Sequence, residues 1–366
     1  MSKLFELSEI NGMVIKNRFV RSATWEGLAT EEGGSTPKLD KMMVDLANGE
    51  TGLIITGHTY VMENGQAGPW QLGIYKDELV SGLKSMTDAV HENGGKIIMQ
   101  LSHAGIYAKE SPKDFVSFAP SEDKEKTVSP HKKMTQEDIA EVVNAFTKGA
   151  QRAKEAGFDG IQLHAAHGYL LSQFLSPLYN HREDYYGGNI RNRSRIIVET
   201  LRSIRKQVGK DFPLMIKINS QDAYKNGLTI KDSINATKLF ADEGLDAVEI
   251  SGGLPLSVRM GPSRFAIKTE EEEAYFKKEA KAFKENLKIP IILVGGIRSY
   301  NIAEEIINKS IADYISMSRP FIKEPDLIRR WIHGDIRKAD CLSDNRCYKE
   351  GKSGEGISCP MKTNTQ

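Results

Sequence analysis

This chain of 366 residues lacks the marks of several large protein classes. It has only three cysteines, Cys341, Cys347 and Cys359, so a disulfide framework is excluded and a reducing compartment is indicated. Its 50 Lys and Arg balance 49 Asp and Glu, so no basic field favours nucleic acid or a membrane surface. No apolar run is long enough to span a bilayer, and the N-terminus has no signal-peptide core. We therefore expect a cytoplasmic protein with neither membrane nor nucleic acid as a partner.

A glycine-rich G-x-G-x-x-G turn after the first apolar run is also missing, which weakens the case for a doubly wound sheet. What is present is an alternation of β-type apolar runs with amphipathic segments. The candidate strands are 19–24, 52–56, 96–101, 160–164, 214–219, 247–251, 291–295 and 314–318. A tight Asn11-Gly12 turn between apolar residues predicts an N-terminal hairpin before them. The pattern predicts a TIM (β/α)8 barrel preceded by a β-hairpin.

Two connections of this barrel are long, 102–135 after the third strand and 165–190 after the fourth. Both follow the carboxyl ends of strands, where barrel enzymes build their active sites. We expect these extended loops to shape a site. The barrel is expected to occupy residues 1–335, and the polar, glycine-containing stretch 336–366 is expected to pack on it as a tail.

The richest segment is the run that follows the fourth candidate strand. His164 and His167 stand three residues apart, and Tyr169 follows two residues later. Two imidazoles and a phenol at a strand end suit a substrate oxygen that gains negative charge and a neighbouring carbon that needs a proton. They are the candidate catalytic residues.

Two polar residues interrupt otherwise apolar strands. Lys217 lies in Met-Ile-Lys-Ile-Asn, and an inward-facing lysine needs an anionic partner, such as the N1 side of a reduced flavin. A lysine that extends to the barrel mouth is the alternative. Gln100 carries an amide that can both donate to and accept from a pyrimidine-like edge, although alone it is typical of a structural residue.

Glycines and an arginine follow the last three strands, in Ser-Gly-Gly at 251–253, Val-Gly-Gly-Ile at 294–297 and Ser-Arg at 318–319. Glycines let backbone N–H groups approach an anion, and arginine adds a charged fork. Because barrels often hold phosphate after strands seven and eight, these pieces together indicate a phosphate cradle.

The run 163–177, Leu-His-Ala-Ala-His-Gly-Tyr-Leu-Leu-Ser-Gln-Phe-Leu-Ser-Pro, resembles the signature of the Old Yellow Enzyme family of FMN-dependent ene-reductases. Matching motifs continue at 16–18, 52–57, 100–105, 180–193 and 294–297, in the order of the family, and the similarity covers roughly residues 4–330. The resemblance implies a barrel that binds FMN at its mouth. It also implies NAD(P)H as the reductant and a hydride transfer to the C=C bond of an enone-type small molecule.

The resemblance also assigns residues by position. His164 and His167 bind the oxygen of the acceptor, and Tyr169 donates the proton. It further implies cofactor contacts. Ser22, Ala23 and Thr24 at the end of the first strand, and Gly57 and His58 after the second, border the flavin, while Gln100 binds its pyrimidine edge and Lys217 lies near its N1. The residues that hold the phosphate are Gly253, Gly295, Gly296, Ser318 and Arg319.

Two alternatives stay open from the sequence. Some relatives run in the opposite direction, as amine or alcohol dehydrogenases that pass electrons to a carrier. A flavin-free phosphate-binding aldolase or isomerase would need Lys217 as its reactive amine. By analogy with relatives we expect a dimer or tetramer of identical chains; the choice between NADH and NADPH is open.

The chain departs from the family at three places. Trp25 stands where many bacterial relatives carry a cysteine beside the flavin, and we expect it to wall the substrate pocket. His58 stands where relatives have a small residue. In the tail, Cys341, Cys347 and Cys359 resemble a four-cysteine iron–sulfur motif in which Asp344 replaces one ligand, so we expect no metal. The sequence ends there, so we expect electrons to come directly from a nicotinamide or from a partner protein.

Overall fold

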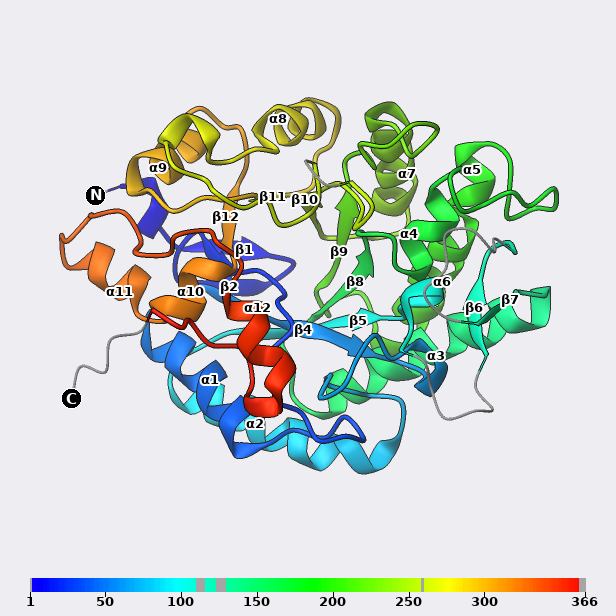
Figure 1. Cartoon of the computed structure of the whole chain (residues 1–366), viewed down its shortest axis with the longest axis horizontal. Helices are drawn as coiled ribbons and strands as arrows, with labels where there is room; N and C mark the ends of the chain where they lie inside the picture. Colours follow the sequence, from blue (N-terminus) through cyan, green and yellow to red (C-terminus); the bar gives the residue numbers. More distant parts are fainter. Residues whose placement is uncertain (1, 110–115, 123–129, 258–259, 362–366) are drawn as a thin grey trace.

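The computed structural model describes residues 2–109, 116–122, 130–257 and 260–361. Eight parallel strands close into a barrel, which confirms the predicted (β/α)8 fold (Figure 1). In chain order they are β3 (Phe19–Arg21), β4 (Leu53–Tyr60), β5 (Ile97–Ser102), β8 (Ile161–Ala165), β9 (Leu214–Asn219), β10 (Ala247–Ser251), β11 (Ile291–Val294) and β12 (Tyr314–Met317). β12 pairs with β3 and closes the ring.

The strands read as nearly continuous apolar runs because both of their faces are covered. Amphipathic helices pack around the outside of the ring, and a short helix follows β12 (Figure 1). These are α1 (Pro37–Asn48), α2 (Val80–Glu92), α3 (Gln136–Glu155), α6 (Arg195–Val208), α7 (Ile230–Asp242), α8 (Lys277–Asn286), α9 (Tyr300–Asn308) and α10 (Arg319–Lys323). Thr side chains cap the N-termini of α1, α3 and α7, and Thr135 forms a capping box with Asp138 at the start of α3.

The predicted hairpin forms from β1 (Ser8–Ile10) and β2 (Met13–Ile15), which pair antiparallel. Its apolar side chains Ile10, Met13 and Ile15 pack against inward-facing residues from the amino ends of the barrel strands. The hairpin thereby fills that end of the ring with apolar atoms, so a polar ligand has access only from the carboxyl ends of the strands.

Two strand boundaries differ from the prediction. β3 ends at Arg21 and not at residue 24, because the Arg21 guanidinium turns inward to the carbonyls of Ile55 and Thr24. β4 continues to Tyr60 with a register shift between Ile55 and His58. The expectation that Gly57 and His58 follow the second strand is therefore wrong, since both lie inside it.

The two long loops carry structure of their own. The loop after β5 contains β6 (Ser117–Ala119) and β7 (His131–Lys133), and its residues 110–115 and 123–129 lie outside the described part. The loop after β8 contains α4 (Leu170–Leu175) and α5 (Ile190–Arg193). Within the described residues, we find no helix both long and apolar enough to cross a membrane.

The tail after α11 (Leu327–Ile332) returns to the barrel and includes α12 (Cys347–Glu350). Arg298 donates to the carbonyl of Cys341, and the Ile357 N–H donates to the carbonyl of Glu26. These bonds hold the tail at the carboxyl ends of β3 and β11. The boundary expected near residue 335 stays a prediction.

Candidate active site

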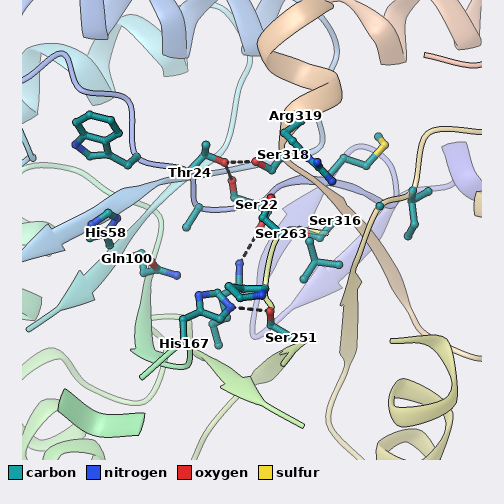
Figure 2. Close-up of a pocket in the computed structure, with 18 of the residues that line it drawn as sticks. Ser22, Thr24, His58, Gln100, His167, Ser251, Ser263, Ser316, Ser318 and Arg319 are labelled. Carbon is teal, nitrogen blue, oxygen red and sulfur yellow. Dashed lines mark hydrogen bonds between the residues drawn. The ribbon is translucent and has the colours of Figure 1, made fainter. Parts of the chain in front are cut away.

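A cavity of about 300 Å³ lies at the carboxyl end of the barrel. Figure 2 shows side chains from several strands and loops directed into it. The sequence-predicted residues that line it are Ser22, Ala23, Thr24, Trp25, His58, Gln100, His164, His167, Tyr169, Lys217, Gly296, Ser318 and Arg319. Residues up to about 300 positions apart in the chain thus converge on one site, whose volume is at the lower end of the range for ligand pockets.

The predicted catalytic trio is brought together as expected from its position. His164 is the penultimate residue of β8, and its ring lies 5.2 Å from that of His167 and 4.7 Å from that of Tyr169, centroid to centroid. His164 is 5 % exposed, and its Nδ1 is buried with no hydrogen-bond partner in the described residues. Since a buried polar atom is rarely left unpaired, this atom is suited to a ligand.

A strained turn directs the second imidazole. His167 has a φ of 60°, in the left-handed region that a non-glycine residue seldom adopts, and Gly168 follows with a φ of 78°. The His167 N–H donates to Asn219 Oδ1 at 3.0 Å, and its Nε2 lies 2.7 Å from Ser251 Oγ (Figure 2). Both bonds fix the ring and leave Nδ1 for a second contact.

Burial keeps these groups neutral. It lowers the pKa of His164 and His167 well below the usual histidine value, and the nearby Lys217 ammonium and neighbouring imidazoles lower them further. Burial also raises the pKa of Tyr169, so its phenol is protonated at neutral pH. The trio therefore offers N–H and O–H donors with no net charge, which suits an oxygen on which negative charge develops.

A buried ion pair lies beneath the cavity. The Lys217 Nζ is 3.2 Å from Glu249 Oε1 and donates to Ser22 Oγ at 2.7 Å. Glu249 also accepts from Ser22, Ser316 and Gln162, at 2.8, 2.8 and 2.9 Å. Burial by itself raises the pKa of Glu249, but Lys217 and these hydrogen bonds together lower it, so the carboxylate is ionised.

This pair gives Lys217 a partner within the protein. Its ammonium pairs with the Glu249 carboxylate and also lines the cavity, so the flavin contact expected from the sequence stays a prediction. The sequence prediction did not include Glu249. Like Lys217, it is a single charged residue in an otherwise apolar strand, Ala-Val-Glu-Ile-Ser, and it pairs in register with Lys217 on the adjacent strand.

Gln100 belongs to the same polar layer. Its Nε2 donates to Gln162 Oε1 at 2.7 Å, and Gln162 donates in turn to Glu249. This chain of bonds fixes the orientation of the Gln100 amide at the cavity wall, where it pairs in register with His58. A rigid amide edge is suited to a pyrimidine edge.

The expected phosphate cradle is assembled only in part. Ser318, Arg319 and Gly296 line the cavity, and Ser318 Oγ lies 2.6 Å from Thr24 Oγ1 (Figure 2). Arg319 Nη1 donates to Asn345 Oδ1 of the tail at 2.7 Å, which aims the guanidinium along the cavity wall.

Three predicted glycines are not among the residues that line the cavity: Gly57, Gly253 and Gly295. The Gly57 N–H is bound by Glu26, that of Gly253 by the Gln221 carbonyl, and the Gly295 carbonyl accepts from the Tyr275 N–H. The N–H groups of Gly57 and Gly253 and the carbonyl of Gly295 are therefore engaged in the fold.

The tail completes the wall, which the sequence did not predict. Ser343 and Tyr348 line the cavity together with Ser263 and Tyr275 of the preceding loops. Trp25 lines it as expected, and the ring packs closely on the tail: a Cβ added to Gly351 would lie 2.8 Å from Trp25 Cζ3.

The tail cysteines border a second, smaller cavity. Cys341, Cys347, Cys359 and Asp344 line a cavity of about 20 Å³ beside Arg319. Burial raises the pKa of Cys347 to about 11, so its thiol is protonated. Across the described residues, no three His, Cys, Asp or Glu side chains are placed to hold one metal ion.

The main cavity is fitted for a phosphorylated, ring-containing cofactor. Lys217 and the fixed Gln100 amide supply a cation and an amide edge at one part of the wall, and Arg319 supplies a guanidinium at another. Gly296, with a φ of 74°, leaves room that a side chain would take, since a Cβ there would lie 2.8 Å from Tyr275. A barrel closed at one end, with neutral donors and phosphate-binding groups at the other, defines a cofactor-dependent barrel enzyme.

Comparison with known proteins identifies the enzyme family. The model of the NADH:flavin oxidoreductase / NADH oxidase family matches residues 3–337. The NADPH dehydrogenase of Geobacillus sp. (strain WCH70) is 38 % identical over 327 residues, which are 88 % of this chain and 91 % of that protein. The chain belongs to this family, the Old Yellow Enzymes, and is an FMN-dependent NAD(P)H oxidoreductase.

Solved structures agree on the fold. The old yellow enzyme homologue from Zymomonas mobilis has a TM-score of 0.76 at 26 % identity and covers 92 % of this chain and 94 % of its own. A 2-naphthoyl-CoA reductase bound to 2-naphthoyl-CoA has a TM-score of 0.90 at 26 % identity and covers 98 % of this chain. Against that reductase the chain spans only 56 % of the length.

Proposed function

We propose that this oxidoreductase reduces the C=C bond of α,β-unsaturated carbonyl compounds. The observation that carries the proposal is the buried Nδ1 of His164, which has no hydrogen-bond partner among the residues that the structure describes. The His164 ring lies beside His167 and 4.7 Å, centroid to centroid, from the ring of a protonated Tyr169. Two neutral donors and one proton source on the same wall match an oxygen that gains charge and a carbon that needs a proton.

FMN, when bound, would supply the redox chemistry, a hydride transfer from NAD(P)H to the substrate. Gln100 and Lys217 would hold its ring, and Arg319, Ser318 and Gly296 its phosphate. His164 and His167 bind the substrate carbonyl oxygen and draw electron density onto it, which makes the β-carbon electrophilic. Tyr169 protonates the α-carbon, and Trp25 limits the size of the substrate.

Anaerobic titration of the purified holoenzyme with NADH and NADPH tests the first half of the proposal. A panel of enones, enoates and nitroalkenes, extended with an aromatic acyl-CoA thioester because the related reductase binds one, tests the second. We expect flavin reduction by a nicotinamide and reoxidation by at least one activated alkene with formation of the saturated product. Reduction by an amine or alcohol alone would contradict the proposal. The expected oligomer of identical chains stays a prediction.

A further inference from the structure

Tyr169 and His58 form a partly buried contact in the active site. The hydroxyl of Tyr169 lies 3.2 Å from Nε2 of His58, and the two rings meet edge to face with centroids 5.4 Å apart. His58 comes from β4 and Tyr169 from the loop after β8, so 111 positions of sequence separate them. Both side chains line the cavity.

Both partners of this hydrogen bond are neutral. Burial lowers the pKa of His58 to about 4, so its imidazole is neutral at neutral pH. Burial raises the pKa of Tyr169, so the phenol keeps its proton. Two neutral forms of the bond are possible: the phenol donates to Nε2 when His58 carries its proton on Nδ1, and the phenol oxygen accepts when His58 carries it on Nε2.

The position of His58 is fixed by the fold. The register shift in β4 between Ile55 and His58 places His58 opposite Gln100 on β5, at the cavity wall (Figure 2). Its carbonyl accepts from Gln71 Nε2 at 2.8 Å. The titratable rings against it are Tyr169 and His164, the latter 6.3 Å away between centroids. His58 is only partly buried, whereas His164 is 5 % exposed.

We propose that His58 returns a proton from solvent to Tyr169 in each catalytic cycle. The proposal rests on the proposed function, in which Tyr169 protonates the substrate. In that step the O–H bond of Tyr169 breaks and a C–H bond of the product forms, which leaves a phenolate. A buried phenolate is unfavourable, and its hydrogen-bonded neighbour is the imidazole.

The proton balance of the return step is simple. In the Nε2–H tautomer, His58 binds one solvent proton at Nδ1 and transfers the Nε2 proton to the phenolate oxygen. The Nε2–H bond breaks, a new O–H bond forms, and the imidazole is left as the Nδ1–H tautomer. The imidazole is neutral before and after, and no electron moves. Each turnover therefore takes one proton from solvent. His58 acts through Tyr169 and is a positioning and proton-returning residue.

The test follows flavin oxidation and proton uptake at the same time. Anaerobically reduced holoenzyme is mixed with 2-cyclohexenone in weakly buffered solution that contains a pH-indicator dye. The first turnover uses the proton that Tyr169 already carries, so flavin oxidation does not need His58. Wild-type enzyme should show both signals in one phase.

Three variants separate the possible roles. His58→Ala removes the imidazole, and His58→Gln keeps a hydrogen-bonding group that cannot carry a proton at neutral pH. In both, the rate of proton uptake relative to the rate of flavin oxidation should fall by about 100-fold, at the low end of what acid–base groups contribute. His333→Gln, at an exposed histidine in a remote turn, is the control and should behave as wild type.

Each outcome decides the matter. Coincident signals in His58→Ala and His58→Gln would overturn the proposal, because solvent would then reach Tyr169 without His58. Slower flavin oxidation in both variants, with no separate lag, would reduce His58 to a support for the Tyr169 ring. Absence of flavin oxidation in the wild type itself, across the alkene panel, would overturn the proposed function and this proposal with it.

Discussion

Lys217 and Glu249 are register partners on neighbouring barrel strands, and their charged atoms lie 3.2 Å apart beneath the active-site cavity. Glu249 is fully buried and Lys217 almost so. Because Ser22, Ser316 and Gln162 complete the carboxylate's hydrogen bonds, the pair meets the condition under which a buried ion pair is tolerated. The buried Glu249 carboxylate thus stabilises the Lys217 ammonium at the wall of the cofactor site.

Removal of that carboxylate should expose the cost of an unpaired buried ammonium. We expect Glu249→Gln to lower the free energy of unfolding of the apoprotein by about 3–5 kcal/mol. The double variant Lys217→Met/Glu249→Gln should recover a large part of this loss, because both charges are then gone. Urea denaturation of the four proteins of the cycle measures the coupling. A single variant as stable as wild type would contradict the role of the pair.

The proposed acceptor site predicts a selective defect in His164→Ala. Loss of one preorganised donor to a developing oxyanion typically costs about 10²- to 10³-fold in rate, or about 2.7–4 kcal/mol. Stopped-flow reoxidation of the reduced enzyme by an enone should slow by that factor, while the ratio of FMN to protein stays unchanged. Unaltered enone turnover would remove His164 from the mechanism.

Arg319 is expected to recognise the phosphate of FMN. Hydrogen bonds to charged groups contribute about 1.5–3 kcal/mol, so Arg319→Gln should weaken FMN binding about 10- to 100-fold. Riboflavin, which has no phosphate, should bind the variant and the wild type equally. Fluorescence titration of the apoprotein with both ligands gives the comparison. Equal losses for FMN and riboflavin would mean that Arg319 supports the cavity wall through Asn345 and makes no phosphate contact.

Buried neutral histidines should make the fold acid-sensitive. Burial lowers the pKa of His103 from 6.5 to about 3, and its Nδ1 accepts from the Gly105 N–H, a bond that protonation would break. Between these two pKa values the unfolded chain binds more protons than the folded one. Stability is therefore full above about pH 6.5 and falls as the pH drops toward 3, by about 1.4 kcal/mol per unit for this histidine.

The pH dependence of urea unfolding midpoints measures this effect. His103→Gln should lose part of the slope between pH 6 and pH 4, within the window that the two His103 pKa values define. His333→Gln, at an exposed site, is the matched control and should keep the full slope. Identical slopes in the wild type and His103→Gln would contradict a neutral His103 in the fold.

Local pattern was enough to predict the architecture. Every one of the eight candidate strands is a strand of the barrel, and the Asn11-Gly12 turn forms its hairpin. The predicted catalytic trio lies on one strand end and the turn after it, so chain connectivity alone keeps it together. These features depend on side-chain periodicity and turn chemistry, which a sequence displays directly.

Contacts between side chains on different strands, and with the tail, depended on the tertiary structure. The sequence indicates that Lys217 is a buried charge, but only the strand register shows that its ion-pair partner is Glu249, 32 positions away. A register shift in β4 brings His58 within hydrogen-bond distance of Tyr169, and no local sequence pattern predicts that shift. The tail supplies Ser343 and Tyr348 because it folds back across the mouth. Which side chains meet across a barrel depends on how far each strand slides against its neighbour, and that offset is set by the packing of the whole ring.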